Sequence, residues 1–196
     1  MRNGIPQVTP HLRLGWRWPE GLRAMRHRNF RLFFFGQLIS LSGTWMQTTA
    51  QQWLVYRITD SQLSLGVVTF AAFLPVLLLS LFMGVIVDRF PRRPLLLLTQ
   101  TWFMLLAVVL AVITALGIVE YWHIILLSFL LGIANALDMP ARQAFFVDMV
   151  EREDLMNAIA LSSSIFNGAR IIGPALGGLI VAGLGDDFLG IGGMAV

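Results

Sequence analysis

Residues 61–119 read SQLSLGVVTFAAFLPVLLLSLFMGVIV, then DRFPRR, then PLLLLTQTWFMLLAVVLAVITALGIV. The two apolar runs, 61–87 and 94–119, contain no Asp, Glu, Lys or Arg. A helix needs about 20 apolar residues to cross the roughly 30 Å hydrocarbon core of a bilayer, and both runs are longer. This stretch therefore predicts two transmembrane helices that are joined by a short charged turn.

The rest of the chain has the same apolar character. Hydrophobic residues make up 57% and charged residues 13% of the sequence, and the mean hydropathy is +0.74. A soluble domain is about half apolar and a quarter charged. We therefore expect an all-α membrane protein with a basic tail (1–31), a transmembrane bundle (32–184) and a short Gly-rich tail (185–196). The apolar runs predict about five spans, at 32–56, 63–87, 94–119, 121–137 and 157–184.

Arginine supplies all 14 basic residues, and its distribution predicts the orientation of the chain. With a cytoplasmic N-terminus, every arginine near a span end falls on the cytoplasmic side except Arg57, as the positive-inside rule requires. The sequence thus predicts a multi-pass protein of the cell inner (plasma) membrane, in contact with the lipid bilayer. Because the arginines flank spans, no nucleic-acid partner is expected. Residues 19–30 could form a basic amphipathic helix on the membrane surface.

Several function classes find no support in the sequence. The chain has no cysteine, which excludes disulfides and thiolate metal sites. No nucleophile–base arrangement, phosphate loop or metal-ligand spacing is found, so we expect no enzyme activity, no cofactor and no metal. A membrane-embedded enzyme would need His or acidic clusters within the spans. The mixed-charge segment 151–154 is interpreted as a solvated linker.

The first predicted span carries a polar stripe. Its members recur at intervals of three and four residues and so share one helix face: Gln37, Ser40, Thr44, Gln47 and Gln51. An unsatisfied polar group in hydrocarbon costs several kcal/mol, so the stripe must face other helices or water. One interpretation is interhelical hydrogen bonding, at about 0.6–2 kcal/mol per contact. Five polar groups on one face favour the other interpretation, a substrate path.

The fifth predicted span contains a charge. Arg170 lies about 20 Å along the helix from Asn157. An arginine at a helix centre costs about 2.5–3.5 kcal/mol on insertion scales, so the side chain should face a partner or a cavity. Asn167 and Arg170 are therefore candidates for the same substrate path. A structural ion pair or snorkelling remains the alternative. Arg170 shares its face with Ser163, Asn167, Pro174 and Gly177.

The charged turn between spans two and three contains an ordered motif: Gly84, then Asp88-Arg89, then Arg92-Arg93. Gly84 lies one helical turn before Asp88, where a close helix approach would let the carboxylate reach a neighbouring helix. Asp88 is the only acid in this turn and suits a salt bridge or a helix N-terminus. Ordinary cytoplasmic arginines would give much of the same pattern.

The spacing of this motif resembles the loop signature of the major facilitator superfamily, although Pro91 stands where that family usually has Gly. The fifth span is similar to the superfamily's exporter motif, with small residues that allow close packing and a proline that bends the helix. Its matching residues are Ala169, Gly173, Pro174, Gly177 and Gly178. Further stretches, such as residues 28–34 and 140–146, look like the drug and siderophore exporter branch that includes the enterobactin exporter.

The resemblance implies the N-terminal helical bundle of a twelve-helix, proton-coupled exporter of small amphipathic molecules. Its partners would be a small-molecule substrate and protons. The resemblance also implies that Arg142 pairs with Asp88 in a cytoplasmic gate. The alternative is that Asp138 and Arg142 are ordinary charges at the membrane boundary. The complete gate would consist of Gly84, Asp88, Arg89, Arg92, Arg93, Asp138 and Arg142.

Two departures from the family pattern affect this interpretation. The fourth span lacks the basic residue that proton-coupled exporters often carry there, and a sixth span is missing. Superfamily transporters consist of two six-helix halves. We therefore expect a truncated chain that is inactive alone and needs a C-terminal half or partner subunit. The alternative is a five-span membrane subunit or scaffold without transport activity of its own.

Overall fold

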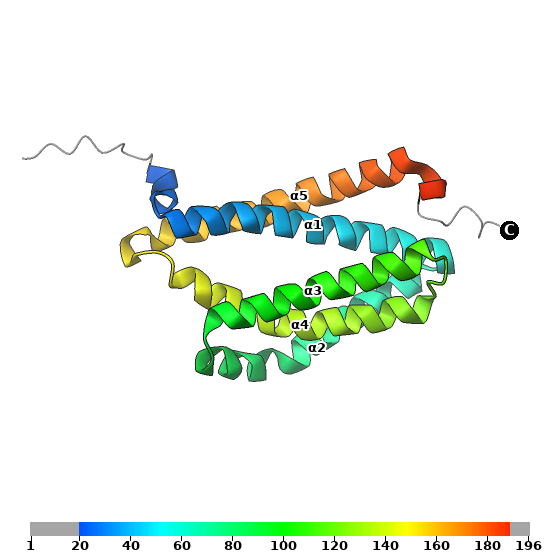
Figure 1. The fold of residues 1–196 in the computed structure, drawn as a ribbon, viewed down its shortest axis with the longest axis horizontal. Helices are drawn as coiled ribbons and strands as arrows, with labels where there is room; N and C mark the ends of the chain where they lie inside the picture. The colour runs from blue at the N-terminus through cyan, green and yellow to red at the C-terminus, as the bar shows by residue number, and fades with distance from the viewer. Residues whose placement is uncertain (1–19, 189–196) are drawn as a thin grey trace, which may run out of the picture.

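The computed structural model describes residues 20–188, which fold into long α-helices and two short 3-10 turns (Figure 1). This arrangement confirms the prediction of an all-α fold with five long helices. Residues 1–19 and 189–196, which include most of the two predicted tails, lie outside the described residues. In chain order the elements are η1 (Glu20–Arg26), α1 (Arg28–Thr59), α2 (Gln62–Arg89), α3 (Arg92–Ala115), α4 (Tyr121–Val147), η2 (Arg152–Asp154) and α5 (Leu155–Phe188).

Several helix ends differ from the ends of the predicted spans. α4 continues to Val147, well beyond the predicted end at Leu137, and α1 begins at Arg28. Hydropathy detects the part of a helix that suits hydrocarbon, whereas the helix itself can continue into the polar region. α3 ends earlier than predicted, at Ala115, because Gly117 adopts a φ of 68° that ends a helix readily.

The helices differ in how well they suit a membrane. Within the described residues, α2, α3 and α4 are long and apolar enough to cross a bilayer by length and composition. α1 and α5 have 32 and 34 residues, so length is not what separates them from the other three. Polar residues interrupt the apolar run of α1, and α1 packs along α5.

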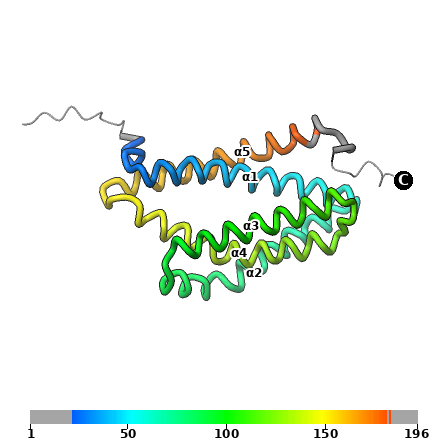
Figure 2. The backbone as a smooth tube through the Cα atoms, in the orientation of Figure 1, coloured from blue at the N-terminus to red at the C-terminus, as the bar shows by residue number. Residues whose placement is uncertain are grey.

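The helices form two groups (Figures 1 and 2). α1 packs along α5, and α4 packs against both α2 and α3. Contacts of α1 with α2 and α4 are much less extensive and join the two groups. Part of this joint is an apolar cluster that includes Leu54 and Val55 of α1, Val68 of α2 and Ile124 of α4.

Glycine allows the closest helix contacts in both groups. A Cβ atom on Gly132 of α4 would clash with the carbonyl oxygen of Ala72 on α2 and lie 3.1 Å from Cδ of Pro75. A Cβ atom on Gly173 of α5 would clash with Cβ of Trp45 and lie 2.8 Å from a backbone oxygen of α1. Small residues at helix contacts are typical of membrane bundles, because lipid offers no hydrophobic drive for helices to associate.

The segment before α1 does not form the amphipathic helix predicted for residues 19–30. Residues 20–26 form a 3-10 turn with a break at Leu22, and α1 starts two residues later. Ala24 and Met25 are buried against Ala158 of α5 in a cluster that also contains Phe30 and Phe146. The segment packs on the bundle because these apolar side chains find a protein surface there.

We expect Gly173→Ala to weaken the packing of α1 on α5, because the new methyl group would overlap Trp45 and Ser42. Overpacking typically costs about 1–3 kcal/mol. SDS-induced unfolding of the purified protein, followed by circular dichroism, measures the change. Gly178→Ala on the same helix is the matched control, since a Cβ atom there has no neighbour within 4 Å. An equal loss of stability in both variants would contradict the close contact at Gly173.

Candidate functional site

The polar stripe of α1 passes through three environments. Gln37 is 9% exposed, and its amide nitrogen has no hydrogen-bond partner among residues 20–188. Thr44 is exposed and donates its hydroxyl to the Ser40 carbonyl at 3.0 Å. The amide of Gln51 donates a hydrogen bond of 2.7 Å to Oγ of buried Ser128 on α4. At this position the stripe has the interhelical hydrogen bonding that was one of its two interpretations. The half-buried members of the stripe are Ser40, Gln47 and Gln51.

Trp45 joins the middle of α1 to the middle of α5. Its ring contacts Phe166 edge-on, with the centroids 6.0 Å apart, and Cζ of Arg170 lies 5.7 Å from its centroid. Gly173 provides the space for its Cβ atom. Asn167 and Arg170, the two α5 residues predicted for the substrate path, are both exposed beside this contact. The amide of Asn167 donates to a carbonyl one turn earlier.

The five residues of the predicted packing motif on α5 fall on different sides of the helix. Ala169, Gly173 and Gly177 are buried on the side that faces α1, where a Cβ on Gly177 would lie 3.3 Å from the α1 backbone. Pro174 is half-buried and Gly178 is exposed. The contact with α1 therefore uses three of the five residues.

Asp88 and Arg142 do not pair in the described part of the chain. Nε of Arg142 instead donates to Asp138, one turn back in α4, at 2.9 Å. Asp138 is 3% exposed and also accepts hydrogen bonds from Oγ1 of Thr99 at 2.7 Å and from Nε2 of Gln100 at 3.3 Å, both on α3. Asp88 is exposed, no hydrogen bond or ion pair of its side chain is seen within residues 20–188, and its negative charge acts on nearby Arg92. The expected pair is absent because Arg142 finds a carboxylate on its own helix.

The other arginines of the turn connect it to the end of α4. Arg92 forms an ion pair with Asp148, which directly follows α4. Cζ of Arg93 lies 5.9 Å from the ring centroid of Phe145 in the last turns of α4. Arg89 is exposed. Together with the Asp138 contacts, these interactions fix the start of α3 against the end of α4.

The close helix approach expected at Gly84 is not seen. A Cβ atom at Gly84 would have no neighbour within 4 Å, so no described helix approaches it closely. α2 and α4 meet closely at Gly132 instead, which the sequence interpretation did not single out. A glycine in the middle of an apolar span was the available signal, because glycine there usually marks a helix contact.

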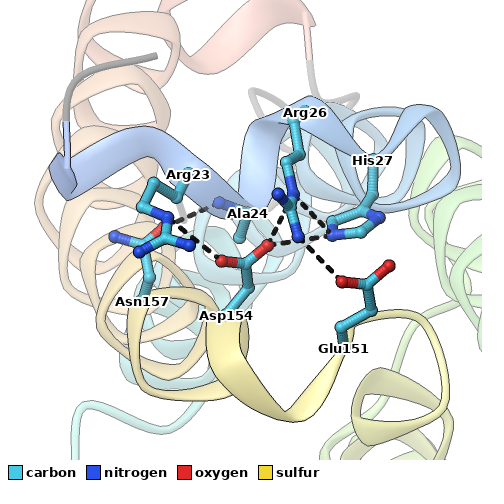
Figure 3. Close-up of polar contacts among 7 residues, drawn as sticks. All are labelled: Arg23, Ala24, Arg26, His27, Glu151, Asp154 and Asn157. Atoms are coloured by element: carbon cyan, nitrogen blue, oxygen red, sulfur yellow. Dashed lines mark hydrogen bonds and ion pairs between the residues drawn. The ribbon is translucent and has the colours of Figure 1, made fainter. Parts of the chain in front are cut away.

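A charge cluster joins η1 to the start of α5 (Figure 3). Asp154 is 1% exposed, and its carboxylate lies 2.8 Å from Nε of Arg26, 3.0 Å from Nε2 of His27 and 3.4 Å from Nε of Arg23. The interpretation of residues 151–154 as a solvated linker is therefore wrong at Asp154. An acid directly before an apolar helical run was a usable signal, since carboxylates favour helix N-termini.

Two further contacts complete this cluster, which we call the Asp154 clasp (Arg23, Ala24, Arg26, His27, Glu151, Asp154 and Asn157). Oδ1 of Asn157 accepts a hydrogen bond from the Ala24 amide at 2.9 Å, and Arg26 pairs with Glu151 at 2.8 Å. Burial alone would raise the pKa of Asp154. The hydrogen bond with His27 and the positive charges of Arg26 and Arg23 outweigh burial, and the pKa is lowered.

Residues 20–189 match the family described as transmembrane secretion effector. The chain belongs to this family of the major facilitator superfamily. It is 31% identical over 153 residues to the staphyloferrin A transporter of Staphylococcus aureus, covering 78% of this chain and 38% of that protein. It is 28% identical over 159 residues to the multidrug efflux pump Tap of Mycolicibacterium fortuitum, covering 79% and 39%.

A third relative, macrolide efflux protein A of Streptococcus pyogenes, is 24% identical over 159 residues, covering 79% of this chain and 39% of that protein. The chain thus spans about two fifths of the length of these relatives. No solved structure matches the chain. The resemblance to the superfamily seen in the sequence is confirmed, as is its position in the N-terminal part of such a protein.

We expect Asp154→Asn to loosen η1 from α5, because Arg23, Arg26 and His27 lose the charge that they share. Weakening such a charge-assisted network costs on the order of 1–3 kcal/mol. Trypsin should then cleave faster at Arg23 and Arg26 in membranes, and the unfolding free energy should fall. Glu153→Gln, at an exposed neighbour, is the control and should change neither. Unchanged cleavage in Asp154→Asn would contradict the clasp.

The lowered pKa of Asp154 determines how its contribution to the free energy of unfolding changes with pH. A carboxyl group whose pKa is lower in the folded protein stabilises fully above its unfolded value, here 3.8, and loses this effect as the pH falls through the folded value. The difference in unfolding free energy between wild type and Asp154→Asn should therefore shrink below pH 3.8. Chemical unfolding at matched pH values measures it, and a difference that grows in acid would be the contrary result.

Proposed function

We propose that the chain forms the N-terminal helical bundle of a proton-coupled secondary exporter of small amphipathic molecules in the cell inner membrane. The observation that carries this proposal is the family match over residues 20–189. Two of the relatives described above are named as efflux proteins, which favours export. The N-terminus would lie in the cytoplasm, where the arginines of η1 and of the α2–α3 turn would also be.

The substrate path would run along the polar stripe of α1 and the polar residues of α5. Thr44 on α1 and Asn167 and Arg170 on α5 are exposed, and the amide nitrogen of Gln37 has no hydrogen-bond partner within the described residues. Polar groups at this depth do not face lipid, because hydrocarbon offers them no hydrogen-bond partner. In secondary transporters of this kind, substrates bind near the bilayer midplane at the contact of the repeats. The proposed path consists of Gln37, Ser40, Thr44, Gln47, Gln51, Asn167 and Arg170.

The cytoplasmic gate would lie at the α2–α3 turn. Arg92 and Arg93 hold this turn to the end of α4, while Asp88 beside them is exposed. A carboxylate at a fixed position suits a contact with a helix N-terminus or an arginine of the rest of the transporter. The proposed gate comprises Gly84, Asp88, Arg89, Arg92, Arg93, Asp138 and Arg142, of which Asp138 and Arg142 support the others from α4.

Transport would require more helices than this chain provides. The chain spans about two fifths of its relatives, and superfamily transporters bind substrate between two halves. We use "complete transporter" for this chain together with the segments that correspond to the remaining length of the relatives. The chain alone would insert into the membrane but would not export.

We expect Asp88→Asn in the complete transporter to lower export without changing the amount of protein in the membrane. One hydrogen bond to a charged group is worth about 1.5–3 kcal/mol, which corresponds to about tenfold or more in rate. Efflux of ethidium from preloaded cells measures the effect. Asp60→Asn is the control, because Asp60 is exposed at the opposite end of α2 and its φ of 45° suits Asn.

Unchanged efflux in Asp88→Asn at equal expression would remove Asp88 from the gate. If the wild-type complete transporter moves no substrate at all, a non-transporting membrane subunit becomes the better function.

A further inference from the structure

Arg170 is a charge in the middle of a long helix. It lies 15 residues beyond Leu155 in a helix that continues to Phe188, so about 22 Å of helix precede it and about 27 Å follow it. Half of the hydrocarbon core is about 15 Å, which is further than an arginine side chain extends. A position far from both helix ends favours a protein or ligand partner over the membrane surface for this charge.

No carboxylate within the described residues neutralises Arg170. The ion pairs of Asp138, Asp148 and Asp154 are formed with other arginines, at the η1 end of the bundle. The described contact of the guanidinium is with the ring of Trp45 at 5.7 Å. A ring face attracts the positive charge but offers no oxygen atom to the five N–H donors of the guanidinium.

The position of the guanidinium is defined by the α1–α5 contact. Trp45 touches Phe166, Arg170 and Gly173, which lie on one face of α5 at successive turns. Gly173 packs directly against Cβ of Trp45, so the start of the Trp45 side chain is held in place. Arg170 thus rests on a preorganised aromatic surface, exposed next to Asn167. Such preorganisation lowers the entropy cost of binding a ligand group.

We propose that Arg170 is an anion-binding residue of the substrate path, and that the exported molecules carry a carboxylate or a similar oxyanion. The planar guanidinium binds such groups through two parallel hydrogen bonds, which an ammonium group does not provide. This inference rests on the proposed export function, because it names the substrate class of the same path. In this inference Arg170 selects substrates by their charge, and neighbouring side chains bind the apolar part of the substrate.

The test uses two dyes with the same xanthene ring and opposite charge: fluorescein, which is anionic at neutral pH, and rhodamine 6G, which is cationic. Binding of each dye to the purified complete transporter is measured by fluorescence anisotropy. We expect Arg170→Gln to raise the Kd of fluorescein about tenfold or more and to leave that of rhodamine 6G unchanged or lower. Arg170→Lys should restore part of the affinity for fluorescein, since lysine keeps the positive charge but cannot form the two parallel hydrogen bonds of a guanidinium.

Arg152→Gln is the matched control, because Arg152 is an exposed arginine in η2 outside the proposed path and gate. Equal loss of both dyes in Arg170→Gln would show a structural role, such as pairing with a carboxylate elsewhere in the complete transporter, and would overturn the proposal. Fluorescein binding that does not depend on Arg170, or no binding to the wild type, would also overturn it.

Efflux of the same dyes from cells separates this inference from the proposed function. Binding of fluorescein that depends on Arg170, together with its export, supports both. Binding that depends on Arg170 without any export keeps the anion site and removes the export function. Export of both dyes with no difference between wild type and Arg170→Gln keeps export and removes the anion site.

Discussion

The contact of Gly173 on α5 with the backbone oxygen of Ser42 and the Cβ atom of Trp45 on α1 is the interaction on which the candidate site depends. In lipid, helices gain no hydrophobic energy from association, so close backbone contact and hydrogen bonds must hold them together. Here glycine lets α1 and α5 meet where neither helix is uniformly apolar. The same contact places Trp45 under Arg170, whereas the polar stripe lies on another side of α1, where Gln51 reaches Ser128 of α4. A bulkier residue at Gly173 would disturb the fold and the candidate path together.

The sequence predicts the helices well and their contacts poorly. Long runs without charge, such as 61–87, predict helices because a helix satisfies all its backbone hydrogen bonds within one segment in lipid. Hydropathy does not show where a helix ends, which is why α4 was predicted too short. Hydropathy also does not show which residues of two helices lie opposite each other, so no sequence pattern predicts the hydrogen bond from Thr99 to Asp138. The Asp138–Arg142 pair did have one, a spacing of four residues on one helix.

The polar contacts at the η1 end strengthen each group of helices separately. Thr99 and Asp138 join α3 to α4, and the Asp154 clasp joins η1 to α5. Between the groups, helix packing is less extensive, and its contacts include the hydrogen bond from Gln51 to Ser128 and the ring contacts of Phe30 and Phe33 with Phe145 and Phe146. Each group is therefore internally cross-linked, and the weaker contact surface lies between them, beside the polar stripe of α1.

The Asp154 clasp has a consequence for the order of events during synthesis. Ala24 and Asn157 are 133 residues apart in the chain, so the clasp cannot close until four long helices have been made. Before that moment Arg23 and Arg26 have no Asp154 to pair with, and their charges are available to orient the first helix in the membrane. Afterwards the same two side chains hold η1 to the fifth helix. With the proposed cytoplasmic N-terminus, Arg23 and Arg26 would therefore have two roles, first in orienting the nascent chain and then in holding η1 to α5.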